Sequence, residues 1–82
     1  MQEIRKLAEK YSHAELENCI EQQISEGSNT CFIGQTPEET MNVLSKASYV
    51  KQQVEEGKTA SILEAIREMA ARMRSIQQTV KK

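Results

Sequence analysis

The sequence predicts an all-α protein: a small four-helix domain over residues 1–82, with two short helices, a loop, and then a longer antiparallel helix pair. Apolar residues recur at spacings of three and four along most of the chain, which is the period of an amphipathic helix. Aromatic residues make up 4% and tryptophan is absent, so the apolar side chains are mainly those that suit helix packing. Because a chain of this size buries only about 60–65% of its unfolded surface, one small core is expected.

The two short helices are predicted at about residues 2–11 and 13–26. Ser12 and Glu15 have the spacing of a capping box, which would start the second helix, and Gly27 is suited to end it. The apolar positions of the first helix are Ile4, Leu7, Ala8 and Tyr11. The expected inner stripe of the second helix consists of Leu16, Ile20 and Ile24, with Cys19 beside them.

A loop is predicted over residues 28–36, where small polar residues surround the apolar triplet Cys31, Phe32 and Ile33. The loop either pins this triplet onto the core or contains one short strand, and the pattern leaves both alternatives open. A lone strand would need a pairing partner.

The third helix is predicted at about residues 37–56. Thr36 is a favourable cap, Pro37 occupies the first helical position, and two glutamates follow in the first turn, where the helix dipole favours negative charge. Gly57 is a natural stop. The expected main face consists of Val43, Ala47, Val50 and Val54, broadened by Met41 and Leu44.

The fourth helix is predicted at about residues 60–79, capped by Thr59 or Ser61, and Ser61 with Glu64 again matches a capping box. One apolar seam runs along it: Ile62, Ile66, Met69, Met73, Ile76 and Val80. The seam predicts packing inside a bundle, and a coiled-coil contact between two subunits is the alternative. For its methionines, ordinary core filling is favoured over an adaptable methionine-rich groove.

Charge is distributed unevenly along the chain. Residues 1–27 carry three basic and six acidic groups, residues 28–57 two and four, and residues 58–82 six and two. Opposite charges on neighbouring helices are the simplest explanation. The functional alternative is a basic surface for an acidic partner or a phosphate backbone. The candidate partner-binding residues are Arg67, Arg72 and Arg74, with Lys81 and Lys82 beyond them.

No cluster of residues has the spacing of a catalytic, cofactor or metal site, so no such site is predicted and the chain is expected not to be an enzyme. His13 is the only histidine, and Cys19 and Cys31 lie twelve residues apart, which are too few ligands for zinc. The start, MQEIRKLAEK, carries charges in every apolar window, so neither a signal peptide nor a membrane span is expected. A cytoplasmic location with free thiols follows, and a disulfide is the less favoured alternative.

The segment TPEET, the turn EEGKTAS and the helix ILEAIREMAARMR, after a short apolar stretch, resemble the ribbon-helix-helix DNA-binding proteins. The resemblance implies a dimer whose strand near Thr30 to Gly34 enters the major groove, with Lys58 and Ser61 beside a phosphate. No Lys or Arg occurs over residues 28–43, however, and the sequence pI is about 5.8. The sequence therefore disfavours a nucleic-acid partner.

The whole layout is also similar to small all-helical bacterial proteins classed as domains of unknown function, a resemblance that implies a fold and no activity. The function predicted from the sequence is a protein-interaction or regulatory module without catalysis, bound to an unknown protein partner. A homodimer is an open alternative for its assembly. A dimeric DNA-binding regulator of the ribbon-helix-helix type is the alternative function.

Overall fold

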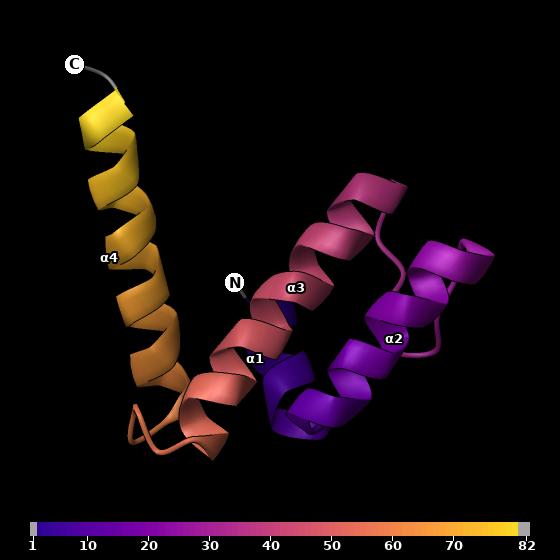
Figure 1. The fold of residues 1–82 in the computed structure, drawn as a ribbon, viewed down its shortest axis with the longest axis horizontal. Coiled ribbons are helices and arrows are strands. Elements are labelled where there is room, and N and C mark those ends of the chain that lie inside the picture. Colours follow the sequence, from indigo (N-terminus) through magenta and orange to yellow (C-terminus); the bar gives the residue numbers. More distant parts are fainter. Residues whose placement is uncertain (1, 81–82) are drawn as a thin grey trace.

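Helix α3 occupies the centre of the fold and contacts each of the other three helices, while α1 also packs against α4. The computed structural model describes the backbone of residues 2–80 and the side chains of residues 2–74 (Figure 1). In chain order the helices are α1 (Gln2–Lys10), α2 (His13–Glu26), α3 (Pro37–Glu55) and α4 (Ile62–Val80). Over residues 2–80 these four helices are accompanied by no strand, so the predicted all-α class and element order are confirmed. Each helix end lies within two residues of its predicted position.

The helix starts of α2 and α3 are made by the predicted side chains. The hydroxyl of Ser12 accepts from the amide of Glu15 at 3.1 Å, and the carboxylate of Glu15 accepts from the amide of Ser12 at 2.9 Å, which completes the capping box. The hydroxyl of Thr36 accepts from the amide of Glu39 at 3.0 Å, directly before Pro37. These caps satisfy amides that an isolated helix end would leave unpaired.

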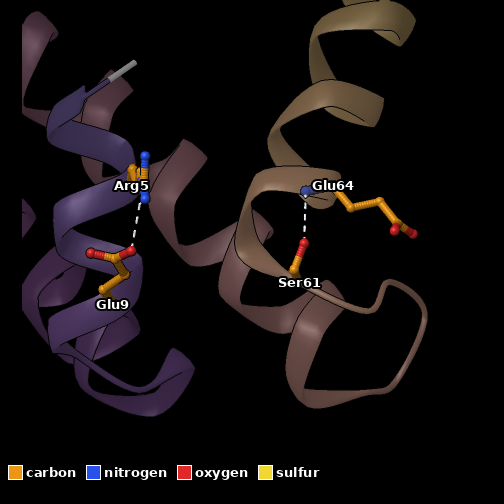
Figure 2. A network of polar contacts seen from close by, with 4 residues as sticks. All are labelled: Arg5, Glu9, Ser61 and Glu64. Carbon is orange, nitrogen blue, oxygen red and sulfur yellow. Dashed lines mark hydrogen bonds and ion pairs between the residues drawn. The ribbon is translucent and has the colours of Figure 1, made fainter.

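At the start of α4, Ser61 rather than Thr59 is the cap, and only half of the predicted box forms. The hydroxyl of Ser61 accepts from the amide of Glu64 at 3.2 Å, whereas the carboxylate of Glu64 points away from the cap (Figure 2). The same view shows an ion pair between Arg5 and Glu9 one turn apart on α1. Both of those side chains are exposed, so solvent screening leaves the pair a minor contribution to stability.

The end of α3 forms a tight glycine turn. Gly57 adopts a φ of 75°, and its amide donates to the carbonyl of Val54 while the amide of Lys58 donates to that of Gln53. This pair of bonds is a Schellman motif, which needs a residue that tolerates the left-handed conformation. The chain is thereby turned towards α4 within six residues.

The core joins all four helices. Its buried apolar side chains are Ile4, Leu7, Ala8, Leu16, Cys19, Leu44, Ala47, Val50, Ala65, Ile66 and Met69. Val43, Val54, Ile62 and Met73 are half-buried against them, as the predicted faces of α3 and α4 require. The side chains of the predicted seam residues Ile76 and Val80 lie outside the described part of the chain.

The predicted inner stripe of α2 is wrong at its end. Ile24 is 70% exposed, and the polar residue before it, Gln23, is buried in its place. The reason is the loop of residues 28–36, which folds back over this face of α2: the side-chain amide of Asn29 donates to that of Gln23 at 2.7 Å. The buried face of α2 therefore runs through Leu16, Cys19 and Gln23.

Residues 28–36 form a loop and not a strand. The side-chain oxygen of Asn29 accepts from the amides of Cys31 and Phe32, an arrangement that turns the chain back on itself. Cys31 and Phe32 pack against the core, while Ile33 is 65% exposed, so two members of the apolar triplet are pinned. The ribbon-helix-helix alternative requires these residues to form a strand that pairs with a second copy, and in the single chain they form a loop.

Helices α3 and α4 diverge from their connecting turn like the arms of a V, α2 lies on the other side of α3, and α1 lies behind α3 (Figure 1). The radius of gyration is 13.2 Å, compared with about 11.7 Å expected for a compact domain of this length. The predicted helix pair is therefore open rather than closely packed along its whole length.

Candidate interaction surface

An apolar groove of about 280 Å³ lies between the two arms of the V. Ser45, Lys46 and Tyr49 of α3 form one wall, and Met69, Arg72 and Met73 of α4 form the other. The groove exists because the apolar seam of α4 continues past the point at which α3 covers it: Met69 is buried, whereas Met73 is only half-buried. We call this feature the α3–α4 groove.

The methionines of α4 lie both in the core and at the groove. Met69 belongs to the core and also lines the groove, so the favoured prediction of core filling describes only part of its environment. Met41 lines a neighbouring hollow on α3 that shares Ser45 with the groove. Met41, Met69 and Met73 therefore line two hollows that meet at Ser45. Thioether side chains are flexible and polarisable, which suits a surface that moulds itself to another apolar surface.

Two cationic side chains line the α3–α4 groove. A terminal guanidinium nitrogen of Arg72 donates to the hydroxyl of Tyr49 at 2.8 Å, which holds the charge at the mouth of the groove. Lys46 lines the opposite wall. Among the described side chains, ion pairs occur only between Arg5 and Glu9 and between Lys58 and Glu56, so neither cation of the groove is neutralised by a described carboxylate.

The three arginines predicted to bind a partner do not share one surface. All three are exposed on α4, but only Arg72 lines the groove. At 3.6 residues per turn, Arg74 lies within about 20° of Arg67 around the helix axis, while Arg72 lies about 140° from Arg67. The structure thus separates one groove arginine from two on the outer face of α4, and Lys81 and Lys82 lie outside the described residues.

A Ser-His-Glu cluster joins α2 to α3, and sequence reasoning missed it because its members are 31 and 35 residues apart. The hydroxyl of Ser48 lies 3.0 Å from Nδ1 of His13 and donates to the carboxylate of Glu17 at 2.6 Å. Nδ1 also lies 3.2 Å from the carbonyl of Ser48, to which the imidazole donates in the tautomer that is protonated at Nδ1.

This cluster is built as a structural clasp. The serine proton points to the carboxylate and not to the imidazole, whereas a nucleophilic serine gives its proton to histidine. Ser48 is also only 3% exposed, so its oxygen is closed to a substrate. A further contact, from the amide of His13 to the carboxylate of Glu55, ties the same end of α2 to α3.

The prediction of free thiols is wrong for this structure: Cys19 and Cys31 form a disulfide, with their Cα atoms 6.2 Å apart. The physical reason is the turn at Asn29, which brings residues twelve positions apart in sequence together at the buried face of α2. The signal that could have indicated the bond is an even cysteine count in a small chain with a limited core, where cross-links commonly supplement stability.

Comparisons with known proteins give no information about the α3–α4 groove. No protein-family model, curated protein sequence or solved structure matches this chain. Within the described residues, no group of three or more His, Cys, Asp or Glu side chains is placed to hold a metal ion. None of the described helices is both long and apolar enough to cross a bilayer. The resemblance to small helical bacterial proteins stays a prediction.

Proposed function

We propose that this chain is a small helical interaction module that works without catalysis and binds an acidic polypeptide at the α3–α4 groove. The observation that carries the proposal is the pair of cations, Lys46 and Arg72, that stand beside an apolar surface without a described carboxylate partner. Apolar area supplies affinity, and charges at its rim select the partner and speed its approach. The DNA-binding alternative depends on a strand at residues 30–34, where the chain has a loop.

A cytoplasmic location is part of the proposal and carries a chemical condition. Cytosolic reductants keep most protein thiols reduced, so in that compartment Cys19 and Cys31 would be a dithiol. Rapid alkylation of cells that express the chain, followed by mass measurement, distinguishes the two states. Alkylation of both cysteines supports the cytoplasmic location, and a protected disulfide contradicts it.

Charge reversal at two arginines of the same helix tests the proposed function. Arg72→Glu places a carboxylate at the groove, and Arg67→Glu makes the same change in charge on the outer face of α4. The probe is a synthetic peptide of leucine, alanine and glutamate, titrated into the ¹⁵N-labelled chain, with a lysine-for-glutamate peptide as its counterpart. At about 0.15 M salt, Arg72→Glu is expected to weaken binding of the acidic peptide by about fivefold or more, since a close ion pair contributes up to about 1 kcal/mol and the new carboxylate repels the peptide.

The Arg67→Glu variant distinguishes binding at the groove from a general effect of the net charge of the chain. Arg67→Glu should change the affinity by less than about twofold, because its charge lies far from the groove and is screened. Equal losses in both variants, or equal binding of the acidic and basic peptides, would contradict the proposal. Circular dichroism of each variant verifies that the fold is intact.

A further inference from the structure

We infer that the partner segment is an amphipathic helix, which lies in the α3–α4 groove with its apolar stripe on Met69, Met73 and Tyr49 and with acidic residues beside that stripe. This inference rests on the proposed function and goes beyond it, because it specifies the conformation of the ligand and how it lies in the groove. It follows from the shape, the lining and the charge of the groove.

The shape of the α3–α4 groove matches one further helix. The residues that line the groove come from α3 and α4 alone, two helices that diverge from their connecting turn (Figure 1). A helix fits between two such helices by setting its ridges into the grooves of both neighbours. An extended peptide would instead need an exposed strand edge for its main-chain bonds, and residues 2–80 contain no strand.

The lining matches the apolar stripe of that helix. The exposed surface of the groove is almost wholly apolar, and its apolar lining residues are the half-buried Tyr49 and Met73 with the small exposed part of Met69. Helices that bind in grooves present apolar anchors at spacings of three and four residues. Met69 and Met73 are four positions apart on α4, so their side chains form a strip one turn long against which such anchors can pack.

The charge of the groove selects an acidic helix over a second copy of this chain. A symmetric dimer through the α3–α4 groove would bring Arg72 and Lys46 of one copy against the same residues of the other, because a two-fold interface pairs identical surfaces. Like charges brought together at an interface oppose association. Glutamates flanking the stripe of a partner helix would meet both cations with the opposite sign.

The test compares three peptides of about eighteen residues, long enough to form helix on binding. The first places leucines at i, i+3, i+4 and i+7 in a glutamate and alanine background. The second contains the same residues in an order that forms no apolar face, and the third replaces the leucines by alanine. Binding is measured by calorimetry to the disulfide-bonded chain and again to the reduced chain, the state expected in the cytoplasm, with circular dichroism to follow peptide helicity.

The amphipathic peptide is expected to bind at least about tenfold more tightly than either control, and to gain helicity when bound. Met73→Gln keeps the length of the side chain while making it polar, and should reduce this affinity by about fivefold or more. Ile24→Gln is the matched control, since Ile24 is an exposed apolar residue on α2, and it should leave the affinity unchanged.

The outcomes separate this inference from the proposed function. One outcome is that the scrambled peptide binds as tightly as the amphipathic one, with both affinities dependent on Arg72. That result would show that an acidic partner binds without forming a helix. It would overturn this inference and leave the proposed function standing. If no peptide binds, the proposed function fails with it. A dimer detected by light scattering, with a mass that falls on dilution and an interface disrupted by Met73→Gln, would assign the groove to a second copy and overturn both.

Discussion

Reduction of the Cys19–Cys31 disulfide is expected to remove a large part of the stability of this protein. The bond joins residues twelve positions apart and ties the middle of α2 to the loop of residues 28–36. In the chain-entropy description, a closed loop of this length restricts the unfolded state by about 3 kcal/mol at 25 °C. A chain of 82 residues has a total free energy of unfolding of about 4–12 kcal/mol, so the bond is a substantial share of it.

The reduced chain should nevertheless remain folded at 25 °C. The contacts of Asn29 with Gln23, Cys31 and Phe32 do not depend on the bond, and the core of the four helices is unchanged by reduction. The loss therefore appears as a lower resistance to denaturant rather than as a loss of helix. Near-native far-ultraviolet circular dichroism in the presence of reductant is the expected observation.

Urea unfolding with and without a phosphine reductant measures the effect. With a slope of about 1–3 kcal/mol per molar urea, a change of about 3 kcal/mol lowers the midpoint by roughly 1–3 M. The control is the double variant Cys19→Ala with Cys31→Ala, whose midpoint must not respond to the reductant. Identical midpoints for the oxidised and reduced native chain, with the bond verified by mass, would refute this reasoning.

Three other predictions concern stability. Ile66→Asp is expected to unfold the domain, because it buries an unpaired charge in the core and costs more than about 3 kcal/mol, and circular dichroism would detect the loss of helix. Thr36→Ala removes the cap of α3 and should cost about 1 kcal/mol in urea unfolding, with Thr36→Ser as a control that keeps the hydroxyl. The hydrogen bond from Gln52, and then that from Lys58, hold the pKa of Glu56 below its ordinary value. The stability that ionised Glu56 contributes is complete above its ordinary pKa and is lost as pH falls through the lowered pKa. Glu56→Gln should therefore reduce the acid dependence of the urea unfolding midpoint. An unaltered acid dependence would contradict a role of Glu56 in stability.

Local chemistry made most of the fold predictable. Ser12, Thr36 and Ser61 each occupy a cap position that can be identified from a few neighbouring residues, because capping bonds join groups at most three positions apart. Gly27 and Gly57 end their helices for the same local reason, and both adopt positive φ. The helix bounds could be predicted from the sequence because they depend on contacts between residues close in the sequence.

The features that could not be predicted depend on contacts between residues that are distant in the sequence. The exposure of Ile24 depends on where the loop of residues 28–36 lies, and that loop is held by Gln23, by the disulfide and by the packing of Phe32 on the core. An amphipathic pattern locates the buried stripe only to within about one residue, so Cys19 and Gln23 could displace Ile24 without disturbing the helix. The Ser48 clasp was hidden for the same reason, since its residues meet only after α2 packs on α3.

The α3–α4 groove required knowledge of how far one helix follows another. Periodicity shows which face of α4 is apolar, but the length of that face covered by α3 depends on the turn at Gly57 and on the packing of α1 against both helices. One continuous seam therefore has two physical roles: Ile66 near the turn is buried in the core, whereas Met73 further along borders the groove. The same kind of substitution should then act differently along α4. A polar side chain at Ile66 should reduce the free energy of unfolding, while one at Met73 should reduce peptide affinity at nearly constant stability, and an equal loss of stability at both positions would show that the groove is simply core.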